Sequence, residues 1–259
     1  MQFFADQQCK LIDFLASKLS LSKNKVKSII DKKKVFVNDK IVWIASYTLK
    51  PNDKIFVLPE NDQNKTFEII FEDQNFIIVN KGCNLVVNES FDSLENKVRK
   101  MYGNDVMALH RIDKDTTGVV VFAKNMQVFE KMKKQWDKVE KTYYCISIGE
   151  ANFWFKEIDY PVFNKTALST VVLVSKNNGL SLFKVRTFTG RKHQIRIHLS
   201  KMGYPILGDY VYGRKINNIK VPRQMLHAYK IEFNFEGKKI FAVAQLPDDM
   251  KKIIKKYGL

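Results

Sequence analysis

Residues 109–124 read LHRIDKDTTGVVVFAK, and this stretch sets the expectations for the larger part of the chain. Its polar side chains come first, namely His110, Arg111, Asp113 and Asp115, and a Thr-Thr-Gly turn and an apolar run follow. The apolar run predicts a buried strand. Carboxylates beside an arginine at the entrance of such a strand lie on a rigid edge, where a reactive group can be held in place. The stretch therefore indicates a candidate site.

Metal binding is one alternative interpretation of this stretch. The residues from Asp113 to Gly118 match the first positions of a calcium-binding loop of the EF-hand type. Position 12 of that loop requires a bidentate glutamate but is Lys124, and the residues before it have the pattern of a strand, so the match is accidental. The four histidines of the chain are His110, His193, His198 and His227. They lack H-x-x-x-H spacing and a C-x-x-C companion, which disfavours a transition-metal site. A purely structural pair between Arg111 and Asp113 is the simplest alternative.

Strand patterns predominate on both sides of this stretch. Apolar and alternating runs predict strands within residues 67–82, 119–124, 142–149, 168–175, 180–190 and 231–246. Helical periodicity is sparser and falls at residues 94–101, 127–139 and 194–202 and near Met250. Short turns join many of the strands, so we expect an α+β fold built on a mixed, mainly antiparallel sheet.

The first 60 residues have a different pattern. An apolar stripe predicts a helix from Leu11 to Leu19, and Ser22 is a candidate N-cap for a second, lysine-rich helix. Two short strands around an Asn38-Asp39 turn and a third strand at residues 54–59 follow. This order resembles the S4 RNA-binding domain, and a generic small αβ module with a lysine-rich face is the alternative. We expect domains at residues 1–60 and 68–259, joined by a polar linker at 61–67.

The composition excludes several classes of protein. Among 259 residues, 44 Lys and Arg stand against 27 Asp and Glu, which gives a formal net charge of +17. The apolar content of 45%, with 11 Gly and 6 Pro, excludes disordered and collagen-like chains. The cysteines Cys9, Cys83 and Cys145 are far apart, as in a cytosolic protein with reduced thiols. The charge fits either a solvated lysine face or a phosphate-rich partner, and the second is the better functional explanation.

Neither a signal-peptide pattern nor an apolar run of about 18 residues is present, so we expect a soluble, cytoplasmic protein.

Four ordered segments together resemble one family of enzymes. The segment HRIDKDTTG is similar to the H-R-L-D-x-x-T-S-G motif of the RluA-type pseudouridine synthases, with Ile112 and Thr117 as mild changes. The other three are KTYYCISIG at 141–149, TGRKHQIRIHL at 189–199 with MGYPILGDYVYG at 202–213, and LHAYKIEF at 226–233. The resemblance runs from about Glu68 to the end of the chain. It implies that the chain isomerises uridine to pseudouridine in RNA without a cofactor or metal.

The resemblance also implies the catalytic residues. Asp113 takes the place of the essential aspartate, and Asp115 falls on a variable position. Tyr143 takes the place of the K-x-Y tyrosine, which can stack on uracil and relay the C5 proton. Strand alternation directs the neighbouring Tyr144 to the opposite face. Arg196 matches the arginine that pairs with the catalytic carboxylate, keeps it ionised and orients it.

Further residues are expected to contact RNA. In the family, the arginine two residues before the aspartate fills the gap that the flipped base leaves in the RNA stack. In this chain that residue is Arg111. We expect Ile197 to lie against the uracil pocket, and Arg191 and Lys192 to meet phosphate. In the S4-like unit, the RNA-binding candidates are Lys23, Lys25 and Lys27 on the polar face of the second helix. The expected substrate is ribosomal RNA of the large subunit, and transfer RNA is the alternative substrate. A non-catalytic RNA-binding protein of the S4 type is the alternative function. The expected oligomeric state is a monomer.

One segment departs from the family pattern. Where the family usually has Lys-Pro-x-Gly-x-x-x-His, this chain has Gly82 for the proline, Asn84 for the glycine and Asn88 for the histidine. Asparagine tolerates the left-handed backbone conformation, so the turn at Asn84 can survive. Gly82 restores backbone freedom, and we expect it to loosen one wall of the cleft.

Overall fold

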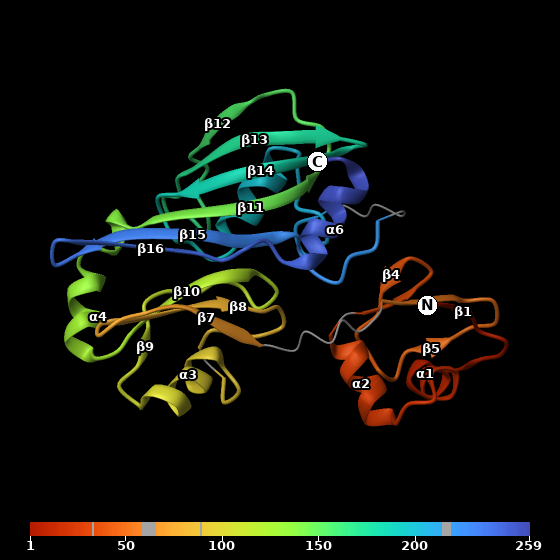
Figure 1. Cartoon of the computed structure of the whole chain (residues 1–259). Coiled ribbons are helices and arrows are strands. Elements are labelled where there is room, and N and C mark those ends of the chain that lie inside the picture. Colours follow the sequence, from red (N-terminus) through yellow and green to blue (C-terminus); the bar gives the residue numbers. More distant parts are fainter. Residues whose placement is uncertain (33, 59–65, 89, 214–218) are drawn as a thin grey trace. The chain divides into compact units, whose positions relative to one another are not determined.

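The computed structural model describes residues 1–32, 34–58, 66–88, 90–213 and 219–259 and divides them into two compact units (Figure 1). The larger unit holds residues 66–213 and 224–259, and the smaller one holds the residues up to 58 together with 219–223. The sequence-based boundaries at 1–60 and 68–259 are therefore corrected for residues 219–223, which belong with the smaller unit. Of the expected linker at 61–67, residues 61–65 lie outside the described residues, and Phe67 already begins a strand.

The smaller unit contains two helices, α1 (Leu11–Leu19) and α2 (Lys23–Asp31). Its four-stranded sheet has the order β1-β6-β3-β4, and a separate pair is formed by β2 and β5. These strands are β1 (Gln2–Phe4), β2 (Cys9–Lys10), β3 (Val35–Val37), β4 (Lys40–Ile41), β5 (Thr48–Leu49) and β6 (Lys54–Val57). The helices and the sheet share one apolar core, in which Leu11, Leu15 and Ile55 are fully buried.

Helix α2 is amphipathic, as expected. The Ser22 hydroxyl accepts a hydrogen bond from the Lys25 amide at 3.3 Å, which caps the first turn. Val26 and Ile30 are fully buried, whereas Lys23, Lys25 and Lys27 are exposed on the opposite face. A lysine-rich surface is therefore presented by an element whose other face is fixed in the core.

The short segment at 219–223 is attached to this unit by one lysine. The Lys220 ammonium pairs with Asp39 at 2.5 Å and lies 4.7 Å from the centre of the Phe56 ring. Asp39 has a left-handed backbone in the β3–β4 turn, with φ of 63°, as the predicted Asn38-Asp39 turn requires. The segment thus packs on the β3–β4 and β6 region of the smaller unit.

The larger unit is built on one large sheet of the order β12-β13-β14-β11-β15-β10-β8-β7, with β16 beside β15 and β9 beside β10. The strands are β7 (Phe67–Glu72), β8 (Phe76–Lys81), β9 (Met107–Ala108), β10 (Thr117–Ala123), β11 (Glu140–Ile148), β12 (Phe155–Ile158), β13 (Ser169–Asn177), β14 (Leu180–Thr187), β15 (Leu226–Phe235) and β16 (Lys238–Val243). The helices are α3 (Leu94–Tyr102), α4 (Met126–Lys133), α5 (Gln194–Lys201) and α6 (Asp248–Tyr257). None of the helices in the described ranges is long and apolar enough to cross a membrane.

The strand pairs recorded in this sheet are antiparallel with one exception, so the predicted α+β class with a mixed, mainly antiparallel sheet is confirmed. The exception joins β10 to β15 through Thr117 and Gly118. A Cβ on Gly118 would lie 2.1 Å from the Ala228 carbonyl oxygen, and the backbone φ is +113°. Only glycine allows the two strands to approach this closely. The Thr-Thr-Gly turn is therefore the point at which the two halves of the sheet join.

Two local expectations were incomplete. The helix expected at 127–139 ends at Lys133, and a 3₁₀ turn at Trp136–Lys138 follows it. In this 3₁₀ turn the Trp136 ring stacks on His110, with the ring centres 5.2 Å apart. Strand β12 was not expected, because three of its four residues are exposed at the sheet edge and show no apolar alternation.

Candidate active site

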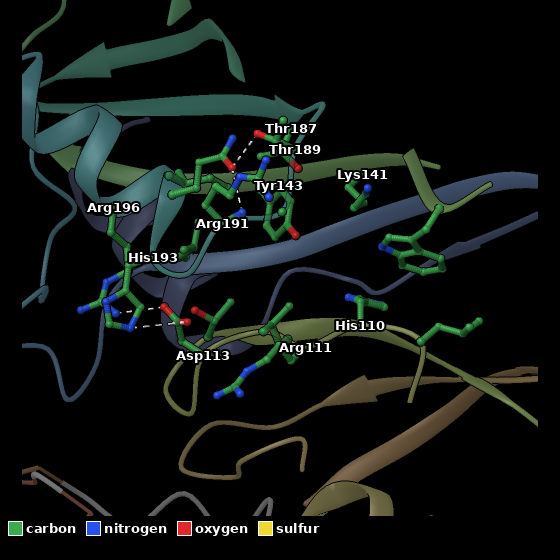
Figure 2. A pocket seen from close by; sticks show the side chains of 18 of the residues that line it. His110, Arg111, Asp113, Lys141, Tyr143, Thr187, Thr189, Arg191, His193 and Arg196 are labelled. Atoms are coloured by element: carbon green, nitrogen blue, oxygen red, sulfur yellow. Dashed lines mark hydrogen bonds and ion pairs between the residues drawn. The ribbon is translucent and has the colours of Figure 1, made fainter. Parts of the chain in front are cut away.

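A cavity of about 370 Å³ opens in the larger unit beside the junction of β10 and β15. Three segments that are far apart in the sequence form its walls (Figure 2). They are residues 109–113 with Thr116 before β10, the side chains of Lys141 and Tyr143 on β11, and Thr187 with residues 189–191 and 193–196 leading into α5. Lys133, Trp136 and Leu226 complete the lining. The cavity therefore collects the sequence motifs that were singled out separately.

Asp113 lies in this cavity and is held by α5. The Arg196 guanidinium donates a hydrogen bond from Nη1 to Asp113 Oδ2 at 2.9 Å. The Gln224 amide lies 3.5 Å from the same oxygen and donates to the Thr116 hydroxyl at 2.8 Å. The Asp113 carbonyl accepts from the Thr116 amide at 3.0 Å, which closes the turn. The carboxylate thus has a fixed orientation, with one edge available to the cavity.

Arg196 is held in turn by a second carboxylate. Its Nε and Nη2 donate to the two oxygens of Asp209 at 2.7 and 2.9 Å, a bidentate pair in which Asp209 is fully buried. Burial by itself would raise the pKa of Asp209, but the hydrogen bonds from Arg196 and from the Tyr212 amide outweigh it and lower the pKa. Sequence analysis assigned no role to Asp209, although it lies in the matched segment 202–213. The GDYVYG sequence there was the available signal.

Tyr143 lines the cavity from the face of β11. Burial and the charge of Asp113 raise its pKa to about 12, against a weaker opposing effect of a hydrogen bond with Thr187. The phenol is therefore protonated at neutral pH. Tyr144 lies outside the cavity lining and packs edge-on against Tyr229 at 4.9 Å, in agreement with strand alternation.

The four histidines have different hydrogen-bond partners, and His193 Nε2 also lies 3.7 Å from Asp113 Oδ1. His193 and His110 both line the cavity; His193 Nδ1 lies 3.0 Å from the Tyr212 hydroxyl, and His110 Nε2 accepts the Val121 amide at 3.1 Å. Burial lowers the pKa of His110 to about 3, and it also lowers that of His193, against the opposing charge of Asp113. His227 bridges Thr117 and Ala244, and His198 contacts the Tyr160 carbonyl. Within the described ranges, no three His, Cys, Asp or Glu side chains are grouped as metal ligands.

The expected RNA-contacting residues divide into two groups. Arg111 and Arg191 line the cavity and are exposed, and Arg191 Nε donates to the Thr166 carbonyl at 2.9 Å. Ile197 is not among the lining residues, whereas Ile195 is, which corrects the expectation for Ile197. Residues 195 and 197 are about 200° apart around α5, so only one of them can face the cavity. Lys192 is exposed and also lies outside the lining.

The loop that departs from the family pattern is held firmly in spite of Gly82. Asn84 has the left-handed conformation that was expected of it, with φ of 59°. The fully buried Lys81 ammonium donates to the carbonyls of Gly82, Leu85 and Lys114 at 2.8, 2.9 and 3.0 Å. Lys114 follows Asp113 directly, so Lys81 ties this loop to the loop that carries the carboxylate. The expected loosening of the cleft wall is thereby opposed.

Comparison with known proteins adds independent information. The family described as RNA pseudouridylate synthase matches residues 75–201, and the S4 domain matches residues 9–55. An RNA pseudouridine synthase of Helicobacter pylori is 31% identical, over 96% of this chain and 91% of its own length. Ribosomal large subunit pseudouridine synthase D of Nitrosomonas europaea is 28% identical, over 98% of this chain and 78% of its own length.

Solved structures give the same fold. The human protein titled RNA pseudouridylate synthase domain containing 4 superimposes with a TM-score of 0.61 and 21% identity, over 73% of this chain and 92% of its own. The ordered motifs, the α+β sheet and these matches lead to one conclusion: the chain belongs to the RNA pseudouridine synthase family of isomerases and carries an S4 RNA-binding domain before its synthase domain.

Proposed function

We propose that the chain converts uridine to pseudouridine in large-subunit ribosomal RNA and that Asp113 is its catalytic carboxylate. The observation that carries the catalytic assignment is the Asp209–Arg196–Asp113 chain of ion pairs at the wall of the cavity that Tyr143 also lines. A buried arginine neutralised by one carboxylate and aimed at another is costly to build, and it serves to orient that second carboxylate. The proposal for the substrate rests on relatives named ribosomal large subunit pseudouridine synthase D in Nitrosomonas europaea and Borreliella burgdorferi.

The reaction is an isomerisation, so atoms and electrons balance within the nucleotide. The N1–C1′ bond breaks with both electrons leaving on uracil, the ring rotates, a C5–C1′ bond forms, the C5 proton is lost and N1 gains a proton. Asp113 can attack C1′, attack uracil C6, or remove the 2′ proton to give a glycal. In each route the carboxylate must be within reach of the sugar or base, and the hydrogen bond from Arg196 holds it in one orientation.

Tyr143 and Arg111 have supporting roles in this proposal. Because the Tyr143 phenol is protonated at neutral pH, it acts as a relay for the C5 proton and not as a preformed phenolate base. Its ring offers a stacking surface for uracil. Arg111 lies exposed at the cavity, where its planar guanidinium can replace the extruded base in the RNA stack. The proposed site draws all of its groups from one chain, so a monomer suffices, and a ribosomal target implies action in the cytoplasm.

Substitution of the aspartate tests the catalytic assignment. Asp113→Asn keeps the side-chain volume but removes the charge and the nucleophile, so pseudouridine formation should fall to background at every RNA concentration. RNA affinity should change little, since phosphate contacts dominate it. Asp115→Asn is the matched control and should remain active. Turnover above a few per cent in Asp113→Asn would contradict both the mechanism and the site.

Mapping of pseudouridine in total RNA from cells with and without the gene tests the substrate. Loss of one or more sites in large-subunit ribosomal RNA is the expected result. A loss confined to transfer RNA would redirect the proposal to that substrate. If no site disappears, the chain is an RNA binder that has retained the scaffold.

A further inference from the structure

Lys141 is a buried lysine whose ammonium has no hydrogen-bond or ion-pair partner in the described part of the chain. It is 7% exposed and lines the cavity, and its Nζ lies 5.5 Å from the centre of the Trp136 ring. No hydrogen bond or ion pair joins that Nζ to any of the described residues. Burial lowers the pKa of Lys141, and the charge of Asp137 opposes this effect. The charged form is therefore under-solvated in the free protein.

A second buried lysine of the same unit shows how such a group is ordinarily satisfied. Lys81 is fully buried, and its three N–H groups are taken up by three carbonyl oxygens. Buried ammonium groups need such partners, because an unpaired charge in a region of low dielectric is costly. Lys141 differs from Lys81 in that it faces a cavity. The missing hydrogen-bond acceptor can therefore arrive with a ligand.

The position of Lys141 indicates which part of the RNA supplies that acceptor. Lys141 and Tyr143 are two residues apart on β11, so they share one face of the strand at a spacing of about 6.6 Å. Figure 2 shows both on the same wall, across the cavity from the segment with His110, Arg111 and Asp113. A uracil stacked on Tyr143 would bring one of its two carbonyl oxygens toward Lys141. The phosphates remain with the RNA chain at the rim, while the flipped base is the part that enters the cavity.

We propose that Lys141 donates a hydrogen bond to a carbonyl oxygen of the flipped uracil and stabilises the negative charge on that ring after the N1–C1′ bond breaks. This inference rests on the function proposed above. The electron pair that leaves C1′ is delocalised over N1 and the two carbonyl oxygens, so an ammonium at one oxygen lowers the energy of the cleaved state. Such a contact acts more strongly on the transition state than on the bound uridine. Trp136 keeps the lysine stem in place through its aromatic face.

The test compares Lys141→Met with wild type in the full-length protein under single-turnover conditions. Methionine keeps an unbranched stem against Trp136 and removes the charge. We expect the rate to fall about 100-fold, as for removal of one preorganised donor at a developing anion. The RNA dissociation constant and its dependence on salt should stay unchanged. Lys184→Met is the matched control, because Lys184 is exposed on β14 beside Tyr144, and it should keep the wild-type rate.

A chemical substitution in the RNA identifies the contact. Sulfur is a poorer acceptor than oxygen, so 2-thiouridine or 4-thiouridine at the target position should slow the wild type at the contacted atom. The same substitution should have no further effect in Lys141→Met. Equal slowing in both proteins at both positions would place the acceptor elsewhere and overturn the proposal.

Two other results would also overturn it. A wild-type rate in Lys141→Met would make Lys141 a packing residue only. Weaker binding with a salt slope reduced by about 0.7 to 0.9 would make it a phosphate contact. Should the methionine variant unfold, Lys141→Gln tests the same point, with an intermediate rate expected because a neutral donor remains. Full activity of Lys141→Met together with no activity of Asp113→Asn would overturn the role of Lys141 and leave the proposed function intact. Residual activity of Asp113→Asn would instead contradict the proposed function.

Discussion

Arg196 is the side chain on which the geometry of the candidate site depends, because it joins two carboxylates from distant parts of the sequence. Its pairing with Asp209 is buried and bidentate, whereas Asp113 accepts a single hydrogen bond at the cavity wall. This division gives each carboxylate a different task. Asp209 fixes the guanidinium, and the guanidinium fixes Asp113.

Asp209→Asn should therefore destabilise the protein by about 3 kcal/mol, since it removes one partner of a buried ion pair. Unfolding in urea measures the change, and Asp92→Asn is the control, because Asp92 is an exposed carboxylate paired with Lys97 and should have almost no effect. The folded state lowers the pKa of Asp209, so its contribution is complete above about pH 4 and is lost as the pH falls through the folded pKa. The variant should lose this part of the acid dependence. If the unfolding free energy of the variant falls at low pH as it does in the wild type, another carboxylate causes the acid dependence.

Tyr143→Phe separates stacking from proton transfer. The ring remains and the hydroxyl is lost, so RNA binding should persist while turnover stops after glycosidic cleavage. Because the pKa of Tyr143 is about 12, the wild-type rate should show no titration of this residue between pH 7 and 10. Single-turnover assays with product analysis check both statements. Tyr144→Phe should behave as wild type; a defect there together with full activity of Tyr143→Phe would contradict the assigned strand face.

Among the elements, the parallel contact between β10 and β15 brings the cavity walls together. The Asp113 loop leads into strand β10, and β15 begins two residues after Gln224. Thr117 and His227 add a buried hydrogen bond of 2.8 Å at the same level. The close approach at Gly118 is thus a structural condition for the site.

Gly118→Ala should be far more destabilising than Gly179→Ala. Both glycines have positive φ, but a Cβ at Gly118 would lie 2.1 Å from the Ala228 carbonyl oxygen, and nothing lies within 4 Å of one at Gly179. The left-handed backbone alone costs about 1–2 kcal/mol, which is the expected effect at Gly179. The excess at Gly118 should be about 2 kcal/mol or more, since the strands must separate. Thermal unfolding of the two variants measures the difference, and equal shifts would refute the role of the close contact.

In the molecule as a whole, the lysine face of α2 is the S4 element expected to grip RNA. Deletion of residues 1–60 would also expose residues 219–223, because Lys220 packs against Asp39 and Phe56. Substitution within the full chain is therefore the better test. It leaves the core of the smaller unit intact, since Lys23, Lys25 and Lys27 are exposed.

Replacement of these three lysines by glutamine should weaken RNA binding and reduce its salt slope by about 0.7 for each lost phosphate contact. The matched control replaces Lys251, Lys252 and Lys255 of α6, which removes the same charge from another exposed helix. Binding titrations at several salt concentrations give both slopes. The same slope change in both triple variants would assign the effect to net charge and not to the S4 unit.

The sequence by itself determined those features that depend on local order and spacing. The Ser22 cap, the apolar face of α2 and the left-handed Asn84 follow from neighbouring residues, and the structure contains all three. The order of four motifs was enough to indicate the family. The alternation along β11 also separated Tyr143 from Tyr144.

The tertiary structure alone decided which distant groups meet. Asp209 pairs with Arg196, Lys81 binds the carbonyl of Lys114, and Ile195 takes the cavity wall in place of Ile197. Lys141 was noticed only as part of a motif, and only the folded cavity shows that its ammonium has no hydrogen-bond acceptor among the described residues. These contacts depend on the register between strands and on the rotation of α5. Those are set by packing of the whole sheet, because a side chain's partners across a fold leave no periodic pattern in its own segment.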